Sequence, residues 1–280
     1  MNKTIKKYLV LFLMVSCVIG IGSYAVAAEH VLKMATTTST DNTGLLDYLA
    51  PTFRAETGID LRWVSVGTGK ALELGKNCDV DVLLVHAPDA EMQYVADGHG
   101  VDRRQIMYND FVFIGPKNDP CAVKGRSAME TLKTIASQKG LFASRGDNSG
   151  THKQELILWA EAEIPVPDKE PWYIQTGQGM LNTITIASER NAYTMTDRGT
   201  FIKYEANWKG NPPLVILVEG DKSLRNQYSV IAVNPKQCSN VKYDLASKFR
   251  AWMTLPKTQQ LIGDFKLLGI QLFVPNAHEK

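Results

Sequence analysis

Cysteines are few in this sequence, and they lack metal-binding spacing. The 280 residues include four cysteines and five histidines, with no Cys-x-x-Cys pair and no Cys/His cluster. A metal site needs several such ligands within reach of one ion. We therefore expect no free metal cation and no cofactor.

The sequence also lacks an excess of positive charge. The whole chain has 31 Lys and Arg residues against 29 Asp and Glu residues. Residues 1–27 hold three lysines and no acid, so the rest of the chain has 28 basic residues, 29 acidic residues and a net charge of −1. Nucleic-acid-binding proteins carry a basic footprint, and proteins that bind anionic lipid carry a polybasic patch. We expect neither partner, so any anion site must be local.

A nucleotide-binding loop is missing as well. Gly67-Thr68-Gly69-Lys70 resembles the end of a P-loop, but Val64 stands where the first glycine is needed. Ala71 replaces the Ser or Thr that would follow the lysine. This turn must therefore have another use.

Residues 1–27 have the pattern of a secretory signal peptide. A basic start precedes an apolar run from Tyr8 to Ile21, and Ala25-Val26-Ala27 supplies small residues for cleavage. We predict a periplasmic protein that is cleaved near Ala27. Cys17 is followed by further apolar residues, so we do not expect it to be lipidated.

Strand and helix patterns alternate after the signal peptide. Val31–Ala35, Ile59–Val66 and Val80–Val85 read as strands, and helical patterns separate them. This alternation predicts an α/β fold with a mostly parallel sheet covered on both faces. Ligands bind such sheets outside the carboxyl ends of the strands.

Three turns rich in small polar residues lie at predicted strand ends. They are Thr36–Ser39, Gly67–Gly69 and Ser144–Thr151, and an amphipathic helix follows each. A helix start presents free backbone N–H groups and favours an anion. Arg145 adds a full charge to the third turn. We predict an oxyanion site, and the alternative is an ordinary strand-to-helix turn with a surface arginine.

The residue types in these turns favour a particular kind of anion. A fully deprotonated tetrahedral dianion offers only acceptors, so its site needs hydroxyls, amide N–H groups and an arginine. A protonated oxyanion would also need an acceptor for its O–H. This chemistry favours tungstate, molybdate or sulfate over phosphate, and it does not separate tungstate from molybdate.

A secreted serine hydrolase that uses Ser149 and His152 is the alternative function. The two residues lie three positions apart at a predicted helix start. A hydrolase also needs a third group to orient the base, and the stretch lacks a Gly-x-Ser-x-Gly elbow. We expect a binding protein and not an enzyme.

Four segments together resemble the tungstate-binding proteins of bacterial ABC transporters. They are Thr36–Asn42, Val66–Leu72, Asp81–Pro88 and Ser144–His152, and they occur in the same order. The resemblance implies a two-lobed, type II periplasmic binding protein in which helices flank a mixed, mostly parallel sheet in each lobe. It also implies a monomer that captures tungstate, possibly molybdate, between its lobes and delivers it to a membrane permease. The oxyanion contacts that the resemblance implies are Thr36, Thr37, Thr38, Ser39, Thr68, Gly69, Arg145, Ser149, Gly150 and Thr151.

The loop-rich stretch Gly115–Pro120 suggests a crossing between the lobes. We predict one lobe from residues 28–113 and 238–280, and the other from residues 114–237. A strand at Tyr228–Val233 would then lie beside Met107–Ile114.

The two predicted neighbouring strands also suggest a disulfide. Cys121 and Cys238 each follow one of them, so we predict that they are bonded and that Cys78 is free.

Overall fold

The computed structural model describes residues 30–279. Val31–Lys280 forms one compact unit, and all statements below concern its described residues. The predicted signal peptide, with Cys17 and the cleavage site near Ala27, lies outside the described residues. None of the described helices has the length and apolar character needed to cross a membrane.

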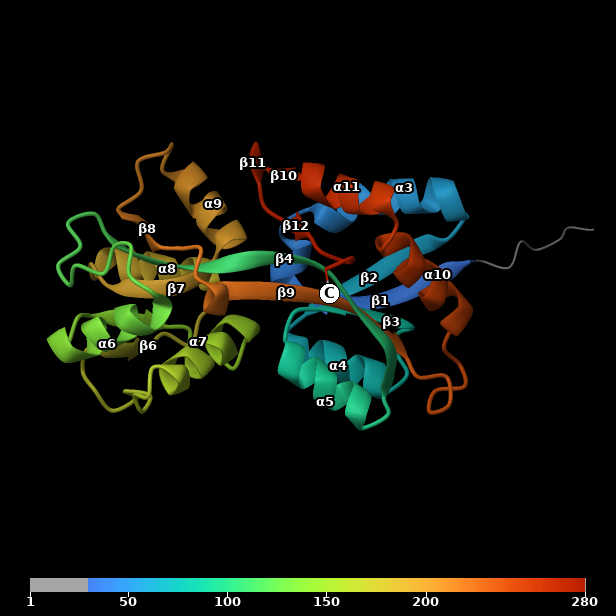
Figure 1. Cartoon of the computed structure of the whole chain (residues 1–280), viewed down its shortest axis with the longest axis horizontal. Helices are drawn as coiled ribbons and strands as arrows, with labels where there is room; N and C mark the ends of the chain where they lie inside the picture. Colours follow the sequence, from blue (N-terminus) through green and yellow to red (C-terminus); the bar gives the residue numbers. More distant parts are fainter. Residues whose placement is uncertain (1–29, 280) are drawn as a thin grey trace, which may run out of the picture. The chain divides into compact units, whose positions relative to one another are not determined.

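A ten-stranded mixed sheet is the centre of the fold, and Figure 1 shows helices around it. In spatial order its strands are β2 (Asp60–Val66), β1 (Val31–Thr37), β3 (Val82–Val85), β9 (Arg225–Val233), β4 (Gly100–Pro116), β7 (Tyr193–Asp197), β5 (Phe142–Ser144) and β6 (Tyr173–Gln175). Two further strands pair with β4, namely β8 (Leu214–Val218) and β12 (Val274–Pro275). A separate hairpin joins β10 (Lys266–Leu267) to β11 (Ile270–Gln271).

Most helices follow the strands in alternation, as the sequence predicts. They are α2 (Thr38–Asp41), α3 (Leu45–Thr57), α4 (Thr68–Lys76), α5 (Pro88–Ala96), α6 (Ala128–Gln138), α7 (Gly150–Glu161), α8 (Met180–Glu189), α9 (Arg198–Asn207), α10 (Tyr243–Met253) and α11 (Pro256–Asp264), with a 3-10 turn at Lys222–Leu224. Local signals explain several boundaries. Gly58 ends α3 in the left-handed conformation (φ 71°), and Ser127 with Glu130 forms a capping box at α6.

The buried apolar residues of the described chain form four clusters, a large and a smaller one around β1, β3 and β9, and a large and a smaller one around β5 and β7. The first core surrounds β1, β2, β3 and β9, and Leu32, Phe53 and Val82 belong to it. The second core surrounds β5 and β7, and Phe142 and Trp159 belong to it. Below, "first core" and "second core" also denote the helices and strands that contribute residues to each.

β4 and β9 are long neighbouring strands between the two cores. Figure 1 shows β4 in green and β9 in orange, side by side through the middle of the sheet. β4 pairs with β9 up to Asp110, and from Phe111 onward it pairs with β7. β4 therefore passes from the first core to the second near these two residues.

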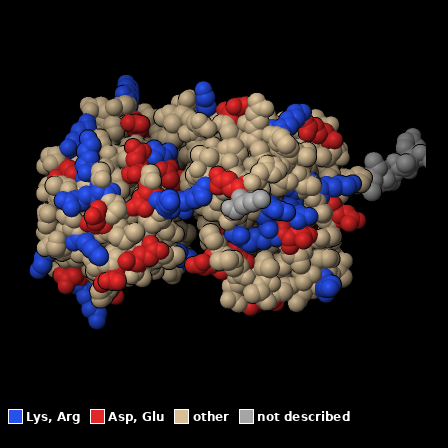
Figure 2. Space-filling model, in the orientation of Figure 1, with Lys and Arg blue, Asp and Glu red and all other residues tan. Residues whose placement is uncertain are grey.

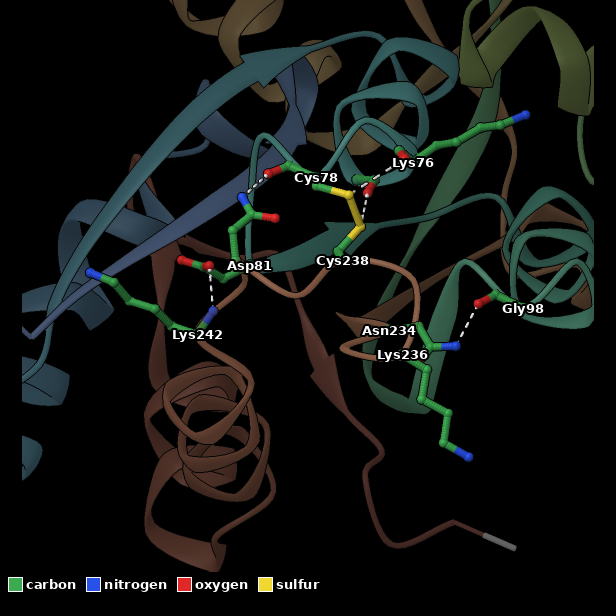
Figure 3. Close-up of a disulfide and its surroundings, with 10 residues drawn as sticks. Lys76, Cys78, Asp81, Gly98, Asn234, Lys236, Cys238 and Lys242 are labelled. Carbon is green, nitrogen blue, oxygen red and sulfur yellow. Dashed lines mark hydrogen bonds between the residues drawn. A yellow bond between two sulfur atoms is a disulfide. The ribbon is translucent and has the colours of Figure 1, made fainter.

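The predicted Cys121–Cys238 disulfide is wrong. Cys78 and Cys238 are bonded, with their Cα atoms 5.4 Å apart, and Cys121 is free and buried. Figure 3 shows the bond beside the end of α4. The two strands on which that prediction rested lie within β4 and β9 and are neighbours. They are antiparallel, however, and Val233 lies opposite Gly100. Their carboxyl ends therefore point in opposite directions, which carries Cys238 away from Cys121.

The disulfide closes a loop with a sequence separation of 160 residues. By chain entropy, a cross-link of this span stabilises the folded state by up to about 5 kcal/mol. We expect replacement of both Cys78 and Cys238 by Ser to lower the melting temperature, whereas Cys121→Ser should change it much less. Peptide mapping without reduction should find a Cys78–Cys238 peptide, and a disulfide that contains Cys121 would contradict this assignment.

Candidate functional site

The three polar turns lead into helix starts at the carboxyl ends of β1, β2 and β5. Thr37 caps α2, where its Oγ1 accepts from the Thr40 N–H at 3.2 Å. Ser149 caps α7, where its Oγ accepts from the His152 N–H at 3.2 Å. Gly67 precedes α4 without a side-chain cap. The first amides of α4 therefore remain available as donors, and in α7 those of Gly150 and Thr151 do, whereas the His152 amide is used by the cap.

The structure brings the starts of α4 and α7 together, although they belong to different cores. A β-carbon placed on Gly150 would lie 3.6 Å from Oγ1 of Thr68 and 3.5 Å from Cε1 of His86. Thr68 begins α4 and His86 follows β3, so both come from the first core. Two helix N-termini that meet in this way concentrate donors and positive potential in a small region.

A cavity of about 360 Å³ lies between elements of the two cores, and Ser39 in its lining contacts the His86 ring at 3.2 Å. The first core contributes Thr38, Ser39, Asn42, Thr43 and Leu267, and the second contributes Arg145, Gly179, Met180, Leu181, Asn182, Asp197, Gly199, Thr200 and Lys203. The surface charge of the protein is mixed, and Figure 2 shows positive and negative side chains interspersed over one face. The positive charge of the cavity is therefore local.

Arg145 reaches the cavity with its guanidinium only partly neutralised. Its Nη2 contacts Oδ2 of Asp147 at 2.5 Å. Its Nε is buried and has no hydrogen-bond partner among the described residues. Burial alone would raise the pKa of Asp147, but hydrogen bonds from Ser149 and the Arg145 charge outweigh it and lower that pKa. A buried donor without a partner is costly, so Arg145 is suited to hold an external acceptor.

The predicted contact residues differ in what they can offer a ligand. Thr36 is fully buried and its hydroxyl donates to the Leu84 carbonyl at 2.8 Å, so it has no hydrogen left for a ligand. Thr68 and Thr151 are buried, and no hydrogen bond among residues 30–279 uses their hydroxyls. Ser149 contributes chiefly through its cap, and Gly69 is exposed.

Sequence reasoning missed four parts of the site. Lys203 lines the cavity from α9 and donates to the backbone carbonyl of Asn42 in the first core. Asp197 is a buried carboxylate in the lining, and both of its oxygens accept from Thr200. The start of α8 also lines the cavity, and the ring of His86 lies against Gly150 at the start of α7. The polar turn before α8 was a signal for that helix start, and nothing local marks the other three.

The geometry does not support the hydrolase alternative. His152 Nδ1 accepts from the Asn148 N–H at 3.0 Å, and Ser149 Oγ accepts from the His152 backbone N–H. The imidazole is therefore not hydrogen-bonded to the serine hydroxyl, as a general base must be. Within residues 30–279 no group of three or more His, Cys, Asp or Glu side chains could hold a metal ion.

Comparisons with known proteins agree with a binding site. The profile of the PBP superfamily domain matches residues 24–257. The tungstate-binding protein TupA of Campylobacter jejuni is 54% identical over 239 residues, which cover 85% of this chain and 88% of that protein. This relative carries the name of a binding protein and not of an enzyme.

Solved structures give the same result for the fold. The tungstate-binding protein TupA from Desulfovibrio alaskensis G20 superposes with a TM-score of 0.85 at 64% identity, covering 89% of this chain and 99% of that one. The tungstate ABC transporter structure from Geobacter sulfurreducens gives 0.75 at 48% identity, covering 85% and 100%. The chain therefore has the type II periplasmic-binding-protein fold.

The close approach at Gly150 can be tested by adding side-chain atoms there. An alanine β-carbon would make ordinary contacts with Thr68 and His86. We expect Gly150→Ala to bind tungstate within about threefold of the parent. Gly150→Leu would overpack the contact, which costs roughly 1–3 kcal/mol, and should weaken binding roughly five- to a hundredfold.

Titration calorimetry measures both affinities, and melting points without ligand should remain close to that of the parent. If Gly150→Leu binds as tightly as the parent, the two helix starts do not enclose the ligand.

Proposed function

We propose a function from one premise: this chain belongs to the PBP superfamily and, within it, to the family of TupA tungstate-binding proteins. In our proposal it captures a tetrahedral oxyanion, tungstate or also molybdate, in the cavity between the two cores. It then delivers the anion to the membrane permease of an ABC transporter. It needs no cofactor for this task.

One observation carries the proposal, namely that Arg145, whose buried Nε has no hydrogen-bond partner among the described residues, lines a cavity between the two cores. The starts of α4 and α7 supply amide donors, and Thr68 and Thr151 supply hydroxyls without partners among the described residues. All these groups can donate to an oxyanion. Hydroxyls and amides that come from both cores would surround an anion on several sides.

The donor set also bears on which oxyanion is preferred. The carboxylate oxygens of Asp197 are both used by Thr200, and one oxygen of Asp147 contacts Arg145. The hydroxyls, the amides and the Arg145 guanidinium are donors, which supports a fully deprotonated dianion that offers only acceptors. Tungstate and molybdate share shape and charge, and the names of the relatives favour tungstate.

We also propose that the two cores correspond to two lobes that close on the ligand. β4 changes partners between Asp110 and Phe111, and β9, from Arg225 onward, pairs with β3 in the first core. These pairings support the view that the chain crosses from one lobe to the other near residues 110–111 and again near residues 224–225. The second crossing would then lie before β9, whereas the sequence suggested a boundary after residue 237.

Family membership also supports a periplasmic location and a permease partner. A related structure is described as a tungstate ABC transporter, which supports transport as the purpose of binding. We also propose that the protein works as a monomer.

The purified protein without residues 1–27 should bind tungstate, with molybdate close behind and phosphate and sulfate much weaker. Because a ligand that binds only the folded state raises the melting temperature, a thermal-shift screen should rank the anions in that order. Titration calorimetry then gives the affinities. Phosphate as the tightest ligand would refute the proposal.

Arg145→Ala should weaken tungstate binding roughly ten- to a hundredfold, because a charge-assisted hydrogen bond contributes about 1.5–3 kcal/mol. Arg145→Lys should recover only part of the affinity, because an ammonium group cannot hold two oxygens in a planar fork. Arg190→Ala, an exposed change on the second core, is the matched control and should bind like the parent.

Melting points of the ligand-free variants must match, so that lost binding is not lost folding. Parent-like affinity in Arg145→Ala would place this arginine outside the site.

A further inference from the structure

His86 occupies a buried position between the hydroxyl turn and the two long strands. It follows β3, and its ring stacks on Tyr228 with 4.7 Å between centroids. Nδ1 lies 2.8 Å from Oδ1 of Asn226 on β9. Nε2 lies 3.0 Å from Oγ1 of Thr37 and 3.2 Å from Oγ of Ser39. Both ring nitrogens are therefore engaged, one on each side.

The neighbours of His86 determine which nitrogen carries the hydrogen. Asn226 uses its Nδ2 to donate to Oδ1 of Asn109 at 2.7 Å and to Oη of Tyr228 at 3.3 Å. The atom that faces the imidazole is therefore the amide oxygen, which can only accept. Burial lowers the pKa of His86, which favours the neutral ring. Nδ1–H then donates to Asn226, and Nε2 is left as an acceptor.

An acceptor at Nε2 must receive a hydroxyl hydrogen from Thr37 or Ser39. Thr37 is the nearer of the two to Nε2, and its oxygen also accepts from the Thr40 N–H and lies 2.7 Å from Oγ1 of Thr40. A hydrogen that Thr40 Oγ1 donates to this oxygen leaves the Thr37 hydrogen for His86. Ser39 lines the cavity, whereas Thr37 does not. With the Thr37 hydrogen on His86, the Ser39 hydroxyl can donate either to Oγ1 of Thr37, 3.1 Å away, or to a ligand in the cavity.

We propose that His86 is a positioning residue that sets the direction of these two hydroxyls and holds their turn against β4 and β9. This inference rests on the proposed oxyanion function. Asn109 on β4 and Asn226 on β9 connect the ring to the strands that pass between the cores. Cε1 of the same ring faces Gly150 at the start of α7. His86 thus contacts the hydroxyl turn, the crossing strands and the opposing helix start.

Two substitutions separate hydrogen bonding from packing. His86→Phe keeps an aromatic ring beside Tyr228 but removes both nitrogens. His86→Gln offers an acceptor toward Thr37 and a donor toward Asn226, which is the polarity assigned to the neutral ring. We expect His86→Phe to bind tungstate about tenfold more weakly, and His86→Gln to remain within about threefold of the parent.

The matched control is His99→Phe, since His99 also contacts a tyrosine ring (Tyr94, 5.6 Å between centroids) and does not line the cavity. It should bind like the parent. Ligand-free melting points show whether each variant is folded. If His86→Phe binds like the parent, or if His86→Gln loses as much affinity as His86→Phe, the positioning role is refuted.

Long-range proton–nitrogen NMR of the parent protein tests the polarity without a variant. The expected result is a neutral His86 with its hydrogen on Nδ1, and a hydrogen on Nε2 would refute the inference even if tungstate binds. If the parent binds no oxyanion at all, the proposed function itself fails. If the parent binds and only the His86 outcomes differ from expectation, the function stands and this inference fails.

Discussion

The antiparallel pairing of β4 with β9 is the constraint on which the other features depend. The two strands join the sheet regions of both cores and set the direction in which each chain segment leaves. Arg198 on α9 holds Asp110 with two hydrogen bonds, of 2.6 and 2.5 Å, near the residue where β4 changes partners. Because the strands are shared, residues of the first core and residues of the second line one cavity, and the start of α7 lies close to the start of α4.

The protein is nearly neutral, and its site uses partial charges to hold an anion. Backbone amides at helix starts add positive potential without adding net charge. The full charge of Arg145 is partly balanced by Asp147, and the oxygens of Asp197 are occupied by Thr200. A cavity of this kind can attract a dianion without a basic surface, which agrees with the mixed charges in Figure 2.

Local chemistry made much of the fold predictable. Gly58 is suited to a left-handed helix end, and Ser127 with Glu130 is suited to a helix start, since each signal lies within a few residues of its effect. The alternation of strands and helices likewise follows from periodicity. The three polar turns were recognisable because helix starts have characteristic residues.

The remaining features depend on residues far apart in the chain. Pairing Cys238 with Cys78 required the direction of β9, which local patterns do not reveal. The partners of His86 are up to 140 residues away, and the Lys203 contact spans 161 residues. The hydroxyl of Thr36 is used inside the sheet, where composition alone made it look available.

The place of β9 in the sheet has a consequence for the order of folding. It lies between β3 and β4, yet it is made after every element of the second core. While the chain is synthesised from its N-terminus, the inner edge of β3 has no partner until residue 225 and beyond have emerged. The first core therefore cannot be completed before the second core has been synthesised. Exposed strand edges in such an incomplete state favour aggregation.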